Sequence, residues 1–236
     1  MINRELNYGR NLIKKFIQNT NLNNETVNIV DLGAGHGDDL KIAGKIYPKS
    51  SRWGCESYKP YVQELSNAGI SVVNINIERD RLPFDNETVD IVIANQVLEH
   101  CKEIFWIFHE VSRVLKKDGI FIVGVPNLAS FHNRALLLAG RQPTPIKTAS
   151  AHVRGFTVGD IQGFVSDCFP GGYRMVDFGG ANFYPFPEII AKPLAKMMPT
   201  LSWGIFMSFK KIEKYSNQFQ IYPTSNQLET NFWVGE

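Results

Sequence analysis

The stretch Val27–Gly37, with the sequence VNIVDLGAGHG, decides how the first half of this chain folds. Its apolar run Val27–Leu32 predicts a short buried strand, because strands that are covered on both faces read as continuous apolar runs. The glycines that follow allow a sharp backbone turn and let a ligand approach the main chain closely. A helical pattern begins at Asp38, and the first turn of a helix offers unpaired N–H groups. The stretch therefore predicts a strand, turn and helix with a ligand site at the turn.

Strands and helices continue to alternate beyond this turn. Short apolar runs predict strands over 52–56, 71–77, 90–94 and 120–125, and helical patterns cover 38–47, 60–68 and 104–115, with Lys116 and Lys117 in the last turn of the third helix. This alternation implies parallel strands joined by crossover helices. Residues 173–178 and 203–209 are expected to add two last strands as an antiparallel edge pair. The predicted fold is a three-layer α/β/α Rossmann-like sandwich with a seven-stranded, mostly parallel sheet and an antiparallel edge strand.

The chain is expected to form one domain over residues 1–214. Its core covers 27–127, an acceptor-side insertion covers about 128–156, and residues 215–236 read as an irregular, loosely packed tail. An amphipathic helix is expected within 1–24 and another helix over 157–169. The apolar region 183–209 contains four prolines, which argue against a regular helix there; these are Pro185, Pro187, Pro193 and Pro199.

Composition narrows the classes of function. The chain has 236 residues and a formal charge of +2, and it shows no basic excess of the kind that nucleic-acid binding needs. Its three cysteines are widely spaced, so we expect reduced thiols in a cytoplasmic protein, with no disulfide framework and no metal site. We also expect no signal peptide and no transmembrane segment.

Two ligand classes suit a glycine-rich first turn: dinucleotides and S-adenosylmethionine (SAM). The dinucleotide fingerprint G-x-G-x-x-G starting at Gly33 requires glycine at position 38, where this chain has Asp38. Asp38 and Asp39 would also place negative charge where a pyrophosphate should sit. SAM carries a positive sulfonium and no phosphate, so the acidic turn favours SAM and argues against an NAD-dependent oxidoreductase.

Several segments of this chain resemble motifs of the class I SAM-dependent methyltransferases and follow one another in the same order. The domain as a whole resembles the methyltransferase type 11 domain. VDLGAGHGDDL (30–40) resembles the first motif of that superfamily, and Glu56 closes the second strand, where its acidic residue holds the ribose. The run IERDRLPFDNETVDIVIANQVLEH (77–100) resembles its adenine loop and fourth strand. RVLKKDGIFIVGVPN (113–127) resembles its fifth helix and strand. The resemblance covers roughly residues 27–127.

The resemblance implies a role for each matching residue. Glu56 would accept hydrogen bonds from the ribose hydroxyls, and Asn95 would face the amino-acid end of SAM. Where the family often has Asp, this chain has Asn76, whose oxygen can still accept from the adenine amino group. The remaining contacts would come from Asp31, Gly33, Ala34, Gly35 and Gly37 at the methionine end and from Asn76, Ile77 and Glu78 at the adenine.

Two histidines are candidates for a general base. His152 lies in HVRGFT (152–157), which resembles an H-x-R-x-F-T segment of some family members that approaches the acceptor, and His100 follows the fourth strand. An imidazole there could remove a proton from an acceptor hydroxyl or amine. Alternatively, His152 and Arg154 form a hydrogen-bonded pair that fixes the loop, and His100 only packs or caps. Arg154 and Phe156 are expected on the acceptor side.

These features predict a SAM-dependent methyltransferase that acts on an O, N or C atom of a small-molecule acceptor and releases S-adenosylhomocysteine. The acceptor could be a metabolite, a sugar or a lipid-linked intermediate. A non-catalytic SAM-binding sensor or partner subunit is the alternative. An aromatic cluster could line the wall of an apolar acceptor site or touch a membrane, although such clusters more often belong to the core; it consists of Phe183, Tyr184, Phe186, Trp203 and Phe206.

Overall fold

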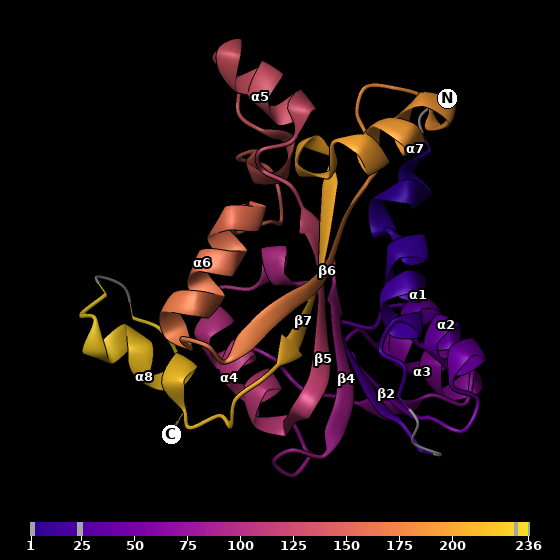
Figure 1. The fold of residues 1–236 in the computed structure, drawn as a ribbon, viewed down its shortest axis with the longest axis vertical. Helices are drawn as coiled ribbons and strands as arrows, with labels where there is room; N and C mark the ends of the chain where they lie inside the picture. Colours follow the sequence, from indigo (N-terminus) through magenta and orange to yellow (C-terminus); the bar gives the residue numbers. More distant parts are fainter. Residues whose placement is uncertain (1–2, 23–25, 229–230, 236) are drawn as a thin grey trace.

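Seven strands form one sheet in the order β3-β2-β1-β4-β5-β7-β6, and the computed structural model describes residues 3–22, 26–228 and 231–235 (Figure 1). The strands are β1 (Asn28–Leu32), β2 (Ser51–Cys55), β3 (Ser71–Val73), β4 (Val89–Asn95), β5 (Leu115–Pro126), β6 (Tyr173–Ala181) and β7 (Gly204–Lys211). The first five are parallel, and β7 is antiparallel to both of its neighbours, β5 and β6. The predicted mostly parallel seven-stranded sheet is therefore confirmed.

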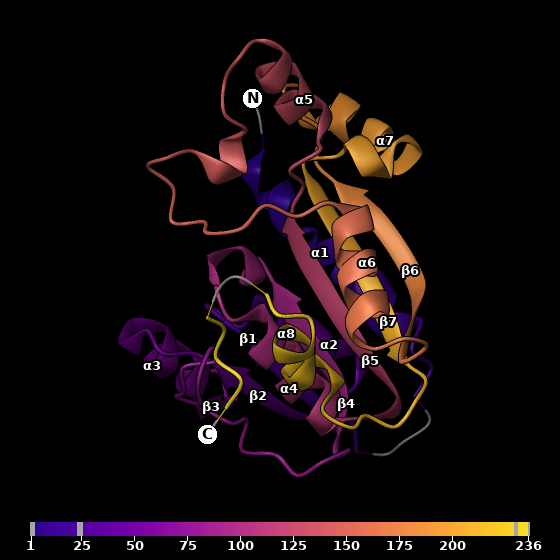
Figure 2. The same cartoon turned by 90° about the vertical axis from the view of Figure 1, so that its left-hand side faces the viewer.

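Helices cover both faces of the sheet, as the sequence predicted. The helices are α1 (Arg10–Gln18), α2 (Asp38–Ile46), α3 (Lys59–Asn67), α4 (Ile104–Val114), α5 (Phe131–Leu138), α6 (Val158–Cys168), α7 (Glu188–Met197) and α8 (Gln218–Ser225), with short 3-10 turns η1 (Arg4–Tyr8), η2 (Leu98–His100), η3 (Thr144–Ile146) and η4 (Pro199–Leu201). One apolar core joins the sheet to α1, α2 and α3, and a second joins it to α4, α6 and α8. Figures 1 and 2 show these two layers on opposite sides of the strands.

The structure corrects three local expectations. Residues 215–236 are not uniformly irregular, because α8 packs against α4 and buries Phe219 completely. The apolar region 183–209 contains α7 despite its prolines, since Pro187 stands before the helix and Pro193 is accommodated inside it. Lys116 and Lys117 belong to β5, because Leu115 takes an extended backbone and pairs with Val89.

Strand register brings the carboxyl ends of the central strands together. Leu32 at the end of β1 pairs with Cys55 on one side and Ala94 on the other. The turns that follow β1, β2 and β4 therefore emerge side by side at one edge of the sheet, which is where open α/β sheets bind ligands. Within the described residues, no helix is both long and apolar enough to cross a bilayer.

Candidate functional site

The glycine-rich turn after β1 requires glycine for two different reasons. Gly33, Gly35 and Gly37 have φ values of 67°, 51° and 71°, in the left-handed region that disfavours other residues. A β-carbon at Gly33 would lie 2.7 Å from Val97 Cγ2, and one at Gly37 would lie 2.5 Å from Leu65 Cδ2. At Gly35 no atom of the residues that the structure describes would lie within 4 Å of such a carbon. Gly33 and Gly37 are therefore needed for packing, whereas Gly35 borders open space.

Glu56 is held directly against this turn. The Gly35 N–H donates to Glu56 Oε2 at 3.0 Å, and the N–H groups of Ser57 and Tyr58 donate to Oε1 at 2.8 Å. The N–H groups of Gly33 and Ala34 donate to the Cys55 carbonyl at 2.9 and 3.2 Å, which ties the turn to the end of β2. The acid that closes the second strand and the bend after the first therefore form one structural unit.

Buried acidic side chains line this end of the site. Asp31 and Asp39 are both buried, and burial, reinforced by the nearby Asp39 and Glu56 carboxylates, raises the pKa of Asp31. Asn95 Nδ2 donates to Asp39 Oδ2 at 2.7 Å and to the Tyr8 carbonyl at 3.0 Å. Asp39 Oδ1 is buried without a hydrogen-bond partner among the described residues. An unpartnered buried acceptor of this kind suits a cationic donor and disfavours a diphosphate.

The residues at this turn fit SAM. Gly35 leaves space that a β-carbon would fill, Glu56 presents a carboxylate beside that space, and Asp39 has an acceptor oxygen to spare. The N-terminal segment, to which the sequence assigned no role in binding, is attached to the same part of the sheet. Its Arg10 pairs with Asp38 at 2.7 Å and lies 4.6 Å from the Tyr8 ring centroid, so η1 and α1 are fastened to this edge of the sheet.

The three residues assigned to the adenine end lie in the loop after β3. The Asn76 side chain is exposed, and its Oδ1 accepts from the Glu78 N–H at 3.0 Å. The Glu78 carboxylate accepts from the N–H groups of Lys102 and Glu103. Ile77 packs against the core. The polar side chains of Asn76 and Glu78 thus shape their own loop, and their contact with adenine stays a prediction.

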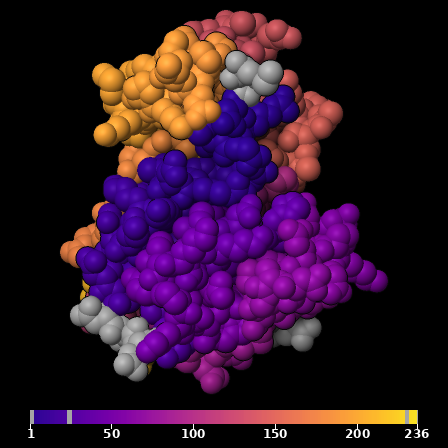
Figure 3. All heavy atoms as spheres, turned by 90° about the vertical axis from the view of Figure 1, so that its right-hand side faces the viewer, coloured from indigo at the N-terminus to yellow at the C-terminus, as the bar shows by residue number. Residues whose placement is uncertain are grey.

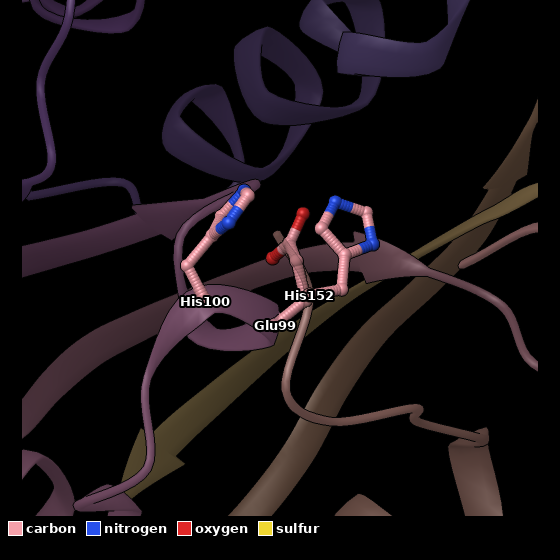
Figure 4. A group of neighbouring side chains, drawn as sticks. All are labelled: Glu99, His100 and His152. Carbon is pink, nitrogen blue, oxygen red and sulfur yellow. The ribbon is translucent and has the colours of Figure 1, made fainter. Parts of the chain in front are cut away.

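A second polar cluster lies at the same edge of the sheet and combines Glu99, His100 and His152 (Figure 4). Glu99 and His100 belong to η2, and His152 comes from the loop that precedes α6. The two imidazole rings meet edge to face with centroids 4.6 Å apart. The Val153 and Arg154 N–H groups donate to the Glu99 carbonyl at 2.8 and 3.2 Å, which joins the two segments. The structure therefore brings together both histidines that the sequence singled out.

Glu99 is the member of this cluster that sequence reasoning missed. It is 2% exposed, and its Oε2, like Nδ1 of His152, lacks a hydrogen-bond partner among the described residues. Burial raises the pKa of Glu99 to about 7, and burial together with the neighbouring His100 lowers the pKa of His152. The signal was present in the run VLEH, where an acid lies four residues beyond the end of the buried strand β4. The position of Glu99 beside the His152 loop, however, depends on the tertiary fold.

The cluster also has the composition of a metal-ligand set. Each of the three side chains offers one ligand atom, and these atoms lie within 4.8 Å of one another. The sequence predicted no metal site, and that stays a prediction, because imidazoles beside a buried carboxylate serve equally well as proton acceptors.

Arg154 and Phe156 hold the loop that carries His152. The Arg154 guanidinium donates to the carbonyls of Cys101 and Lys102 at 3.2 and 2.6 Å, so Arg154 fixes the loop through backbone carbonyls and not through the expected pair with His152. Phe156 is buried, and its carbonyl accepts from the Leu128 N–H at 2.8 Å. Both residues also line a largely apolar cavity of about 380 Å³ between α4 and α6. Their contact with an acceptor stays a prediction.

Known proteins share this fold. A chain of the complex between the Haloferax volcanii Trm112 methyltransferase activator and its methyltransferase superposes with a TM-score of 0.60 and 15% identity, covering 85% of this chain and 88% of that one. A SAM-dependent methyltransferase of Thermotoga maritima superposes with a TM-score of 0.59 and 17% identity, covering 87% and 90%. This chain therefore shares its α/β fold with these two proteins.

Sequence comparison identifies the domain itself. Residues 30–123 match the model of a methyltransferase domain family. YrhH of Bacillus subtilis (strain 168), a provisionally named methyltransferase, is 28% identical over 106 residues, which are 43% of this chain and 58% of YrhH. The chain therefore spans little more than half the length of this curated relative. Residues 30–123 are therefore similar to a methyltransferase domain, and this likeness implies SAM as the cofactor.

Proposed function

We propose that the chain transfers a methyl group from SAM to an O, N or C atom of a small-molecule acceptor and releases S-adenosylhomocysteine. The observation that carries this proposal is the hydrogen bond from the Gly35 N–H to Glu56. It places a carboxylate beside open space at the turn, next to the buried acids Asp31 and Asp39. Such a pocket suits a ligand that combines a ribose diol with a positive charge.

Each group at the cofactor end has a defined task in this proposal. When bound, SAM supplies a methyl group that its positive sulfur has already activated. Glu56 holds the ribose hydroxyls, while Asp31 and Asp39 orient the positively charged end. Holding two reactants in line is worth about 7–11 kcal/mol of barrier lowering, so positioning is the main contribution of the chain.

The cluster of Glu99, His100 and His152 acts on the acceptor. An acceptor hydroxyl or amine must lose its proton when its oxygen or nitrogen gains a methyl group. Among the described residues, Glu99 Oε2 and His152 Nδ1 have no hydrogen-bond partner, and Cys101, Arg154 and His100 are ionisable groups nearby. A general base of this kind contributes about 10²–10⁴-fold to the rate.

Two measurements test the proposal. Calorimetry with SAM and NAD side by side should show binding of SAM alone, and a metabolite screen should reveal an acceptor through formation of S-adenosylhomocysteine. Glu56→Gln removes the charge at the turn and should weaken SAM binding roughly tenfold to a hundredfold, since hydrogen bonds to charged groups are worth about 1.5–3 kcal/mol. Glu64→Gln, which removes an exposed carboxylate that pairs with His36 instead, is the matched control. Equal SAM affinities of the Glu56→Gln and Glu64→Gln variants would contradict the proposed binding site. SAM binding without turnover of any acceptor would contradict the proposed methyl transfer and would indicate a sensor or partner subunit.

A further inference from the structure

Two helices at one end of the molecule have their large apolar side chains turned outward. Helices α5 and α7 both lie at the end of the molecule where the parallel strands have their carboxyl ends (Figures 1 and 2). Leu138 at the end of α5 is 92% exposed, and Ile189 and Met197 on α7 are 83% and 77% exposed. We call the surface that α5 and α7 present to solvent the apical face. Figure 3 shows from another side that α7 and the neighbouring N-terminal segment occupy this end.

The burial pattern of both helices is the reverse of that expected for a surface helix. Helix α5 buries Asn133, whose side chain bonds to the Asn127 carbonyl and accepts from the Thr144 N–H. Helix α7 buries only the small residues Ala191 and Ala195. A surface helix normally turns its large apolar side chains toward the core. Exposed apolar side chains gathered in this way mark a surface that binds a partner or a membrane.

The charge around the apical face indicates which of these occupants fits. Segments 127–150 and 182–203 contain five lysines and arginines but a single carboxylate, Glu188. Glu188 is already paired with Lys192, which leaves the remaining cations unbalanced. They are Arg134, Arg141, Lys147 and Lys196, all of them exposed. The chain as a whole is nearly neutral, so positive charge is concentrated beside the exposed apolar side chains.

We propose that the apical face docks on the surface of an anionic phospholipid bilayer. Apolar side chains inserted at the headgroup level, surrounded by lysine and arginine, are the features by which interfacial helices bind such surfaces. Neither helix is long enough to span the bilayer, so the chain would lie on it. The apical face lies at the same edge of the sheet as Glu99, His100 and His152.

Vesicle sedimentation with the full chain tests this proposal. The chain should sediment with vesicles of phosphatidylcholine and phosphatidylglycerol, bind vesicles of phosphatidylcholine alone far more weakly, and be released by salt. The double variant L138E/I189E should lose binding. Removing cations with R141Q and K196Q should weaken binding roughly fivefold for each residue. Ile221→Glu, which changes a half-exposed residue of α8 at the opposite end, is the matched control and should bind as the original chain does.

The outcomes separate this proposal from its alternatives. Equal binding of L138E/I189E and the original chain, or no binding to either vesicle, would overturn it. A dimer seen by light scattering that L138E/I189E dissociates, without vesicle binding, would show that a second copy covers the apical face. SAM binding measured by calorimetry should stay unchanged in all variants, so failure of membrane docking is distinguishable from failure of the proposed methyl transfer.

Discussion

Gly35→Ala separates the two properties of the glycine-rich turn, its fold and its capacity to hold a ligand. Gly35 has a φ of 51°, and its added β-carbon would meet no atom within 4 Å. The folded chain therefore tolerates the methyl group sterically and suffers only the strain of a left-handed alanine, about 1–2 kcal/mol. A chain of this length loses about 2–4 °C in melting temperature for each kcal/mol, so we expect a fall of about 2–8 °C.

The same methyl group should have a larger effect on SAM binding. It would occupy the space beside Glu56 that the proposed ligand must use. Forcing an extra carbon into a packed contact costs about 1–3 kcal/mol, which corresponds to a loss of affinity of roughly fivefold to 150-fold. Isothermal titration calorimetry with SAM measures this loss directly, and thermal unfolding without ligand measures the strain.

Gly69→Ala is the matched control for this comparison. Gly69 has a φ of 69°, and a β-carbon there would also meet no atom within 4 Å, but it lies in the turn before β3, at the opposite edge of the sheet. Both variants should therefore melt at similar temperatures, and only Gly35→Ala should lose affinity. If the two variants bound SAM equally well, the open space at Gly35 would not be the cofactor site and the reasoning would fail.

Three further predictions test the core and the acceptor side. Phe219→Ala should destabilise the chain by about 3–5 kcal/mol in denaturant unfolding because the Phe219 side chain is fully buried. The control Ile221→Ala, on the same helix, should change stability by less than about 0.5 kcal/mol. Similar losses in the two variants would show that α8 does not belong to the core. Burial raises the pKa of Glu99 from 4.5 to about 7, so the stability that this group contributes is full below about pH 4.5 and is lost as the pH rises through about 7. Glu99→Gln should remove this part of the pH dependence of unfolding, and an unchanged profile would refute the assignment. His152→Ala or His100→Ala should slow methylation of an O or N acceptor by about 10²–10⁴-fold, and unchanged rates in both variants at every pH would exclude a histidine base.

The cofactor end of the site was predictable because its signals are local. Gly33, Gly35 and Gly37 follow a buried strand directly, and Glu56 ends the next strand along the chain. Parallel strands in register bring such neighbouring turns to one edge without any further information. The structure places Glu56 against this turn, where its carboxylate accepts from the Gly35 N–H, and SAM binding by these residues stays a prediction.

Other features escaped sequence reasoning because tertiary contacts override local preference. Pro193 argues against a helix, yet α7 forms because its alanines pack on the body of the molecule. The sequence suggested a polar tail over 215–236, but Phe219 and Pro223 are buried and Tyr222 packs against the core, which anchors α8. The sequence predicted Lys116 in the last turn of a helix. In the structure it belongs to β5, and its ammonium group pairs with the buried carboxylate of Asp90 at 2.8 Å.

The two ends of the proposed site, a cofactor end at Gly35 and Glu56 and an acceptor end at Glu99 and His152, also differ in what determines their shape. The cofactor end is built from turns after β1, β2 and β4, which the sheet register places together in any chain with this topology. The acceptor end joins η2 to a loop that returns only after β5, α5 and η3, so its shape depends on the whole insertion between β5 and α6. Changes in that insertion can therefore alter what reaches Glu99 and His152 while leaving Gly35 and Glu56 in place. For this reason the cofactor could be inferred from short motifs, whereas the identity of the acceptor must come from experiment.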